Sequence, residues 1–284
     1  MDNTVEPGRP PSGVSQRGGL SGPLLAYMQQ LDAHICTLAA DYAPENQQHS
    51  PLLPVAKLDA ADHFSSFPHQ AMFAAAAAPD KDNLKSFAAE PVDAAGHLNV
   101  PALDAVDCCL TPGACYPIYI DQEGAELEET KYITVRSTCF RQEEQERLEP
   151  LIRQRAFTMR ELVCMGTQDD VEKFLATLTQ RVEDMCQALD LPIVFVQATD
   201  PFFEPRRNKK FLMQKVAPVK MEMTYQEHLA IGSVNDHRNG FGNTFAILLH
   251  GEPIHSGCVA FGLERWLYCL QEQHGEDPAA WPAI

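Results

Sequence analysis

Two strand-like segments that follow one another constrain this chain more than any other feature. Residues 131–140 and 156–165 are rich in β-branched and aromatic residues, and only the charged connection 141–155 lies between them. Strands joined by a short connection of this kind pair as an antiparallel hairpin. In a chain of 284 residues, which is long enough for one large domain or a domain with an appendage, the hairpin predicts a fold built around an antiparallel sheet.

A long helix follows the hairpin. Thr167 is a typical N-cap residue, Asp169 and Asp170 place negative charge in the first turn, and apolar residues recur at helical spacing up to Leu189. Spacing and propensity predict further helices at 23–41, 71–78 and 263–274, and further strands at 193–197, 219–225, 228–233 and 244–249. Successive strands with one long helix between them predict an α+β fold, an antiparallel sheet flanked by helices.

Composition divides the chain into segments. Residues 1–22, rich in Pro, Gly and Ser, predict a disordered tail, and 23–102 predict a helical or irregular N-terminal region packed on the core, which is expected at 103–284. No apolar run approaches the roughly 20 residues of a membrane helix, and the N-terminus lacks the apolar region of a secretory signal. A cytoplasmic protein without membrane contact is therefore expected.

Charge and cysteine usage narrow the function classes. The net charge of −17 disfavours nonspecific nucleic-acid binding, so an anionic ligand is expected at one of two local basic patches, 147–160 or 206–210. The chain has nine cysteines, an odd number, and no export signal. Free thiols or metal ligands are therefore expected rather than a disulfide framework.

The hairpin brings arginines to one edge of the predicted sheet. Arg141 ends the first strand, and Arg153, Arg155 and Phe157 begin the second. The guanidinium fork suits phosphate oxygens, and an aromatic ring can stack on a flat base. On spacing alone, a solvated hairpin with salt bridges between Arg and Glu is the simpler interpretation.

Several stretches in a fixed order resemble one family. FRQE, an arginine-bearing loop and AFTMRE resemble motif 2 of class II aminoacyl-tRNA synthetases, and GCVAFGLERW resembles their motif 3. LTPGACYPIY, ATDPFF and AIGSVNDHRNGFG are similar to one branch, the atypical seryl-tRNA synthetases and their short relatives, the amino acid:[carrier protein] ligases. The resemblance covers roughly residues 103 to 270 and implies a class II synthetase-like catalytic domain at 103–284.

The resemblance implies an ATP site. Arg265 would hold the γ-phosphate, and Arg141 would hold the α-phosphate, where charge builds during adenylate formation. Glu143 would hydrogen-bond the adenine, Phe157 would stack on it, and Mg²⁺ would bridge the phosphates. Without a nucleotide, Arg265 would instead pair with Glu264 at a helix N-terminus, where a cation is disfavoured.

The same resemblance implies the rest of this pocket. Arg153 and Gln154 would line the nucleotide site, with Arg155 as the alternative because the loop after Arg141 looks longer than usual. Ser233 and Asn235 would lie near the ribose, and Gly262 would let the backbone approach the nucleotide. The remaining positions implied for ATP are Ala230, Ile231 and Gly232.

The resemblance also implies a zinc site held by Cys115, Glu161 and Cys258. Three protein ligands leave a fourth position for the substrate's α-amino group, so Glu161 would also be a substrate-binding residue. Taken alone, each cysteine is more often a buried apolar residue, and that remains the interpretation for Cys108, Cys109, Cys139 and Cys164. Strand alternation predicts that Cys164 points away from Glu161.

The implied activity is ATP-dependent activation of glycine or alanine and transfer to the phosphopantetheine thiol of a carrier protein. The enzyme would be a homodimer, and tRNA is not expected because the region before residue 103 is short, acidic and alanine-rich. The alternatives are a seryl-type aminoacyl-tRNA synthetase and a non-catalytic, synthetase-like regulatory subunit. Arg206, Arg207, Lys209 and Lys210 would form the carrier-protein docking patch, or simply a solvated loop.

Overall fold

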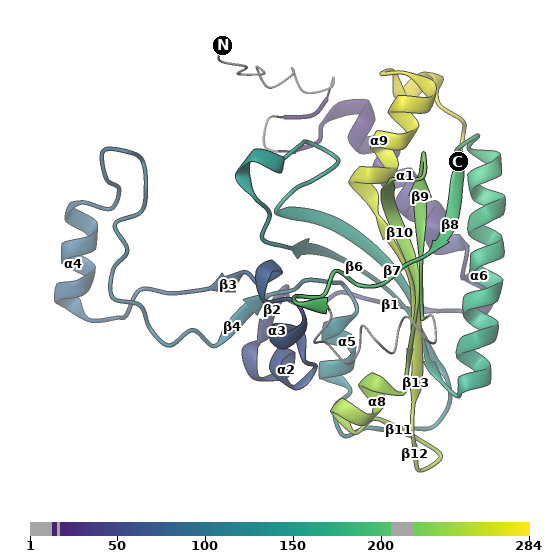
Figure 1. Ribbon diagram of the computed structural model, residues 1–284, viewed down its shortest axis with the longest axis horizontal. Helices are drawn as coiled ribbons and strands as arrows, with labels where there is room; N and C mark the ends of the chain where they lie inside the picture. The colour runs from purple at the N-terminus through teal and green to yellow at the C-terminus, as the bar shows by residue number, and fades with distance from the viewer. Residues whose placement is uncertain (1–12, 16–17, 206–218) are drawn as a thin grey trace.

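The computed structural model describes residues 13–15, 18–205 and 219–284, and a seven-stranded sheet forms its centre (Figure 1). The shortest strand, β1, runs parallel to its neighbour β6, and every other neighbouring pair is antiparallel. The predicted α+β architecture with an antiparallel sheet is confirmed. In spatial order the strands are β1 (Glu45–Gln47), β6 (Lys131–Phe140), β7 (Ala156–Gly166), β13 (His255–Gly262), β10 (Leu229–Arg238), β9 (Lys220–Tyr225) and β8 (Ile193–Gln197).

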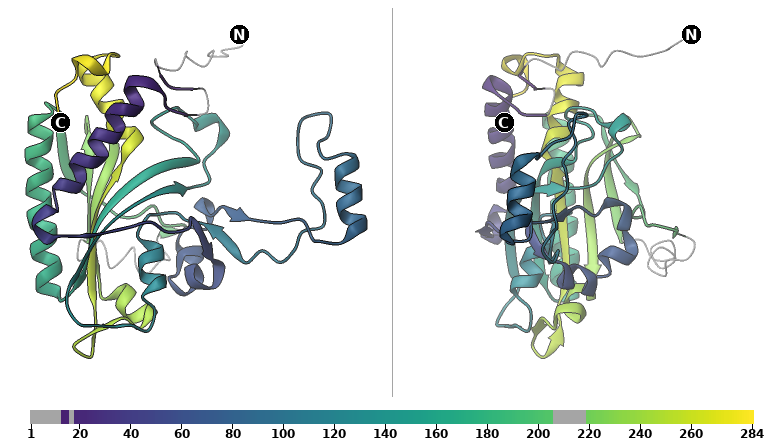
Figure 2. Two further views of the ribbon diagram at one scale, coloured as in Figure 1. Left: turned by 180° about the vertical axis from the view of Figure 1, so that it is seen from behind. Right: turned by 90° about the vertical axis from the view of Figure 1, so that its left-hand side faces the viewer.

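Three helices cover one face of this sheet: α1 (Gly22–Thr37), α6 (Gln168–Ala188) and α9 (Leu263–His274) (Figure 2). As predicted, α6 begins at Thr167, whose hydroxyl accepts a hydrogen bond from the backbone N–H of Asp170 at 3.2 Å. The largest core cluster lies between these helices and the strands, and Cys164 belongs to it. Because side chains alternate along a strand, the residues next to those in this cluster face the other side.

That opposite face carries the short helices α5 (Tyr116–Asp121) and α8 (Gly240–Phe245). A second core cluster joins them to the sheet and includes Cys115, Val163 and Cys258. Cys164 and Val163 therefore lie in different clusters, and Cys164 points away from Glu161 as the alternation predicts. A small three-stranded sheet borders this face: β5 (Glu126–Leu127), β11 (Leu248–Leu249) and β12 (Glu252–Pro253).

The segment 23–102 contributes more than one kind of structure. It supplies α1 and β1 to the main body, and it also forms a third core cluster around Leu53, Leu58 and Cys109. Residues 81–89 form α4 (Lys81–Ala89), on an arm that projects from the body in Figure 1. The remaining elements of this part are α2 (Val55–Ala60), α3 (His63–Ser66), β2 (Leu52–Pro54), β3 (Phe73–Ala74) and β4 (Cys108–Leu110).

Short 3₁₀ turns complete the described structure, at Ala40–Tyr42, Pro68–Gln70, Gln145–Arg147 and Pro278–Ala280. Within the described ranges, no helix combines the length and apolar character needed to cross a membrane.

Two predicted elements are wrong. The alanine-rich run at 71–78 is not helical, because β3 pairs with β4 and Ala77 bridges to Leu103, and this pairing overrides alanine's helix propensity. The strand expected at 244–249 begins as the end of α8, which Ala246 terminates in a left-handed conformation (φ 51°), and only Leu248–Leu249 are extended. The strand predicted at 228–233 is real but continues to Arg238 as β10.

Candidate functional site

Cys115 and Cys258 converge on the face of the sheet opposite the long helices. Cys258 lies in β13, directly opposite Val163 of β7 and Asn235 of β10, and Cys115 is the N-cap residue of α5. The ligand atoms of Cys115, Cys258 and His237 all lie within 4.8 Å of one another. The resemblance predicted Glu161 as the third ligand beside the two thiols. The structure brings the two thiols together, but the third member of this group is His237, and Glu161 is not part of it.

Glu161 is buried beside this group, with 3% of its surface exposed. Its Oε1 accepts a hydrogen bond of 2.8 Å from the backbone N–H of Ala114, whereas its buried Oε2 has no hydrogen-bond partner. Burial and the neighbouring Cys258 raise the pKa of the Glu161 carboxyl to about 8. A buried carboxylate oxygen without a donor is unfavourable, and a cation between it and the thiols would relieve that cost.

His237 contacts both the thiol pair and two hydroxyl groups. Its Nε2 is 3.7 Å from Cys258 Sγ, and its Nδ1 is 3.2 Å from both Tyr119 Oη and Ser256 Oγ. The polar residues Ser233, Asn235 and His237 occur at every second position. Had the predicted strand been extended beyond residue 233, this alternation would have placed His237 on the same face as Ser233 and Asn235.

The sulfur atoms of the pair are electrostatically unequal. The neighbouring Cys115 thiol and the His237 ring hold the pKa of Cys258 well below its usual range despite burial. The Cys258 sulfur and burial together raise the pKa of Cys115. Although burial opposes it, the charge of Cys258 raises the pKa of His237. Thiolate and imidazole groups at this spacing are suited to a soft divalent ion such as Zn²⁺.

Asn235 also faces the thiols. Its Nδ2 donates hydrogen bonds to Cys258 Sγ at 3.4 Å and to Ser233 Oγ at 2.9 Å. Ser233 and Asn235, which the resemblance placed near the ribose, thus form a polar row beside Cys258. Their neighbours in the chain, Val234 and Asp236, point to the opposite face.

Arg141, in the motif 2 hairpin, contacts the loop that leads to the thiol centre. Its Nε and Nη2 donate to the carbonyl of Pro112, at 3.2 and 3.1 Å, on the loop that leads to Cys115. Its guanidinium carbon is 5.0 Å above the centre of the Phe157 ring. The predicted phosphate-binding arginine and the predicted base-stacking ring are therefore in direct contact.

Arg265 and Glu264 do not turn towards each other. Arg265 donates to the carbonyls of Ile152 and Ala230, at 2.7 and 2.5 Å. Glu264 accepts the backbone N–H of Thr158 with both carboxylate oxygens, each at 2.9 Å. The alternative expectation of an Arg265–Glu264 pair is wrong.

Arg265 belongs to a cluster of cations. Burial and the nearby positive charges of Arg141 and Arg153 lower the pKa of Arg265. Like charges brought together at a partly buried site are unfavourable unless an anion joins them. The cluster is therefore the best-supported place for a polyanionic ligand among the described residues.

Glu143 is held by the arginines of the connection. Its Oε2 accepts a hydrogen bond of 2.8 Å from Arg153 Nη1, and its backbone carbonyl accepts two of 3.1 Å from Arg155. The salt bridge that spacing alone predicted therefore exists. It pairs Arg153 of the arginine cluster with Glu143, whose charge offsets part of the repulsion on Arg265. Gln154 packs against Gly18, where an added Cβ would clash with the Gln154 amide.

The remaining positions implied for ATP lie where β10 pairs with β13. Ala230 accepts the Arg265 hydrogen bond, and Ile231 is buried in the main core. A Cβ on Gly232 would come within 2.5 Å of the Ala260 carbonyl, so the strands need a glycine there. A Cβ on Gly262 would meet only the Ile231 carbonyl, at 3.4 Å.

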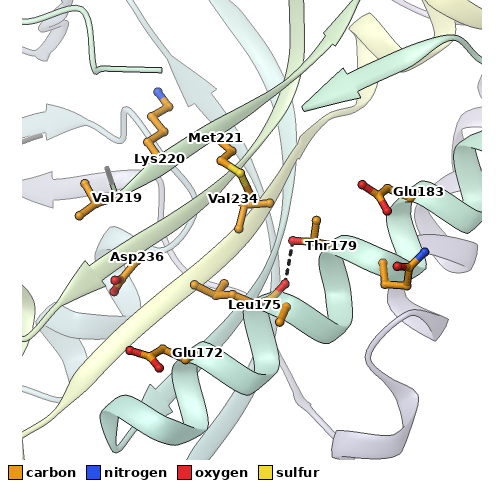
Figure 3. Close-up of a pocket in the computed structure, with 11 residues that line it drawn as sticks. Glu172, Leu175, Thr179, Glu183, Val219, Lys220, Met221, Val234 and Asp236 are labelled. Carbon is orange, nitrogen blue, oxygen red and sulfur yellow. Dashed lines mark hydrogen bonds between the residues drawn. The ribbon is translucent and has the colours of Figure 1, made fainter. Parts of the chain in front are cut away.

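A separate hollow of about 530 Å³ lies on the helix-covered side, between α6 and strands β9 and β10 (Figure 3). Val234, Asp236 and Leu175 line it together with acidic side chains of α6, and none of the predicted site residues does. The predicted basic patch, Arg206, Arg207, Lys209 and Lys210, lies outside the described residues.

Comparison with protein families gives one matching model. The tRNA synthetase class II core domain (G, H, P, S and T) matches residues 106–274, more than half of the chain. The matched region includes both thiols and both predicted phosphate-binding arginines.

Two curated relatives come from Bradyrhizobium diazoefficiens. Amino acid–[acyl-carrier-protein] ligase 1 is 32% identical over 259 residues, which is 88% of this chain and 78% of the relative. Ligase 2 is 34% identical over 189 residues, 64% of this chain and 56% of the relative. A type-2 serine–tRNA ligase of Methanococcus maripaludis is 27% identical over 187 residues, but the match spans only 36% of its length.

Solved structures show the same fold. The chain is similar to Methanopyrus kandleri seryl-tRNA synthetase, solved with a tRNA(Sec), at a TM-score of 0.77 and 17% identity, with 96% of this chain and 56% of that chain covered. A seryl-tRNA synthetase from Pyrococcus horikoshii complexed with ATP gives a TM-score of 0.66 at 12% identity, with coverage of 90% and 52%. The chain thus spans about half the length of these synthetases.

Proposed function

The chain belongs to the class II tRNA synthetase core family as a homologue of the amino acid–[acyl-carrier-protein] ligases, and we propose that it activates a small amino acid with ATP and loads it onto a carrier protein. The amino acid is glycine or alanine, and the acceptor is the phosphopantetheine thiol of the carrier. In the first step the amino-acid carboxylate attacks the α-phosphorus of ATP, and pyrophosphate leaves. In the second, the thiol sulfur forms the thioester bond as the bond to AMP breaks and the thiol proton is released.

One observation carries the proposal. The guanidinium of Arg141 is hydrogen-bonded to the Pro112 carbonyl on the loop that ends at Cys115. This contact joins the side chain proposed for the α-phosphate to the thiol pair proposed to fix the amino group. Adenylate formation needs the carboxylate and the α-phosphate held side by side, and this arrangement of the two binding groups suits it.

In this proposal, different residues bind the phosphates and the adenine of ATP. Arg141 and Arg265 bind the α- and γ-phosphates, and the electrostatic crowding of the arginine cluster is relieved when the triphosphate arrives with Mg²⁺. Phe157 stacks on the adenine, and Glu143, held in place by Arg153 and Arg155, accepts its amino group. Ala230, Ile231, Gly232, Ser233 and Gln154 complete the walls of the nucleotide site.

The residues around the thiols fit a zinc ion. Two cysteine sulfurs, the orphaned Oε2 of Glu161 and the Nε2 of His237 are all ligands that zinc accepts. Bound there, zinc would supply a Lewis-acidic position for the unprotonated α-amino group. The protein's part is to orient that amine, which leaves the carboxylate of the amino acid directed towards Arg141.

The names of the curated relatives support a proposal for the carrier protein, and the family resemblance supports one for the assembly. We propose a homodimer, and because carrier proteins are acidic we propose that the basic sequence Arg206, Arg207, Lys209 and Lys210, which lies outside the described residues, contacts the carrier. A phosphopantetheine thiol rather than tRNA is the proposed acceptor.

Two assays on the purified 284-residue chain test the function. Amino-acid-dependent exchange between ATP and pyrophosphate, over a panel of amino acids, is expected with glycine or alanine. Loading of a phosphopantetheinylated carrier protein is then expected to exceed aminoacylation of total tRNA. If no amino acid in the panel supports exchange, a regulatory subunit is favoured. If tRNA is charged preferentially with serine, a synthetase is favoured. Either result overturns the proposal.

A further inference from the structure

More groups surround the thiol pair than a working zinc site uses. Cys115, Cys258 and His237 bring their ligand atoms within 4.8 Å of one another, and Glu161, whose Oε2 has no hydrogen-bond partner, lies buried beside them. If the Glu161 carboxylate also reaches the ion, these four donors would fill a tetrahedral shell. A zinc ion that binds substrate keeps one position open. One of the four donors must therefore be absent from the metal when the amino acid is bound.

His237 has the geometry of a ligand. A tetrahedral ion with bonds of about 2.3 Å to sulfur and about 2.0 Å to nitrogen separates those two atoms by about 3.5 Å. The Nε2 of His237 is 3.7 Å from Cys258 Sγ. Its other nitrogen, Nδ1, lies 3.2 Å from the hydroxyls of Tyr119 and Ser256, as metal-bound imidazoles usually engage their second nitrogen.

Glu161 is held much more firmly than His237. It lies in the middle of β7, paired with Val135 on one side and Ala260 on the other, and the Ala114 N–H fixes its Oε1 at 2.8 Å. Its backbone and its carboxylate both have fixed partners, so Glu161 cannot leave the centre without disturbing the sheet.

His237 lies instead at an irregularity of β10. The register with β13 shifts between Asp236 and Arg238, and Arg238 adopts a left-handed conformation with φ 52°. Bulges of this kind redirect a side chain and interrupt regular pairing. The ring is only partly buried, and its two hydroxyl contacts are at the long end of hydrogen-bond distances.

We propose that His237 is a ligand of the resting metal centre and gives up its place to the α-amino group of the incoming amino acid. The inference rests on the proposed function, because it assigns a role at the amino-acid position of that site. His237 then competes with the substrate, and the apparent affinity for the amino acid falls by the fraction of molecules in which the histidine is bound.

X-ray absorption at the zinc edge tests this directly on the wild-type protein. Without amino acid, the spectrum is expected to contain the outer-shell scattering of one imidazole. At a saturating concentration of the amino acid that supports exchange, that scattering is expected to disappear. Imidazole scattering absent from the resting protein, or unchanged by the amino acid, overturns the inference.

A variant gives an independent readout. His237→Gln removes the competing ligand while Cys115, Cys258 and Glu161 remain, so zinc should be retained and the KM for the amino acid in the exchange assay should fall. If the histidine occupies the metal in nine of ten resting molecules, the fall is about tenfold. His228→Gln, on the same β9–β10 hairpin and exposed, is the control and should leave KM unchanged.

The outcomes separate this inference from the function on which it rests. A merely structural role for His237 would raise KM in the His237→Gln protein, and a raised or unchanged KM contradicts the exchange of ligands. If the wild-type protein catalyses no amino-acid-dependent exchange of ATP and pyrophosphate, the proposed function itself is defeated. Normal exchange of ATP and pyrophosphate by a wild-type protein whose zinc carries no histidine defeats only the inference. Normal exchange without any zinc defeats the inference together with the zinc role proposed above, but not the activation of the amino acid.

Discussion

Arg160 and Asp32 form a buried ion pair that joins helix α1 to the centre of the sheet. Arg160 Nε and Nη2 donate to the two carboxylate oxygens of Asp32 at 2.7 and 2.8 Å, and both side chains are more than nine-tenths buried. Arg160 precedes Glu161 in β7, so the two consecutive side chains project to opposite faces of the sheet. One anchors the helix layer, and the other belongs to the candidate metal centre.

The substitution Asp32→Ala should destabilise the protein strongly. It leaves the Arg160 guanidinium buried without its partner, which costs about 3–5 kcal/mol of unfolding free energy. Urea unfolding followed by circular dichroism measures the loss. Asp41→Ala is the control, because its pair with Arg181 is exposed and should contribute less than about 1 kcal/mol. Equal effects of the two substitutions would contradict the structural role given to Asp32.

The substitution Cys258→Ser should remove the metal. A serine hydroxyl is a poor zinc ligand beside a thiolate, so the zinc content should fall from about one ion per chain to nearly none. Elemental analysis of dialysed protein measures it. Cys164→Ala is the matched control, since Cys164 is buried in the cluster on the other face and should leave the zinc content unchanged. Full zinc occupancy in the Cys258→Ser protein would show that the ion is held elsewhere.

The substitution Arg265→Ala should slow amino-acid-dependent exchange of ATP and pyrophosphate by about 10²–10³-fold, the usual cost of losing a positioned group that stabilises charge in the transition state. Arg265→Lys keeps the positive charge but loses the forked guanidinium group, so its exchange rate should lie between those of the wild-type and Arg265→Ala proteins. Arg147→Ala removes an exposed arginine from the connection between β6 and β7, where it pairs with Glu144, and this substitution should change the rate little. A rate in the Arg265→Ala protein close to the wild-type rate would remove this residue from the nucleotide site.

His63 should make the protein less stable in mild acid. Burial, together with the charges of Arg141 and His69, lowers its pKa from the usual 6.5 to about 4. Below about pH 6.5, His63 is therefore protonated in the unfolded chain but stays neutral in the folded protein. The free energy of unfolding falls as the pH decreases towards 4. The loss between pH 7.5 and pH 5 is about 2 kcal/mol.

The substitution His63→Phe isolates that effect. The ring lies among Phe64, Phe67 and Tyr116, and neither of its nitrogens has a hydrogen-bond partner, so a phenyl ring suits the site. The difference in unfolding free energy between wild type and variant should change by about 2 kcal/mol over this pH range. A difference that does not vary with pH would mean that the folded protein protonates His63 as readily as the unfolded chain does. His228→Phe, at an exposed position and not among the groups that shift the pKa of His63, serves as the control.

Local pattern predicted the elements that depend on neighbouring residues. The hairpin at 131–166, the Thr167 cap and the helix at 263–274 all appear as expected, because β-branched runs, capping hydroxyls and helical apolar spacing act over a few residues. The helix predicted at 71–78 failed because the partner strand of this run, β4, lies about 35 residues further along the chain, where Phe73 pairs with Cys109. The end of β10 was missed because polar residues continue there on a partly buried face.

The order of the motifs resembles a known family, and this resemblance predicted Cys115, Cys258, Arg141 and Arg265 as parts of one site. Glu161 and the two cysteines entered that prediction only through the resemblance, and His237 was absent from it. Only the tertiary structure decided which side chains, distant in the sequence, lie on the same face of the sheet and contact one another. The strand register that sets Asn235 opposite Cys258, and the bulge that follows it, bring His237 to the thiols. Register and bulges arise from pairing between strands far apart in the chain, and no local spacing encodes them.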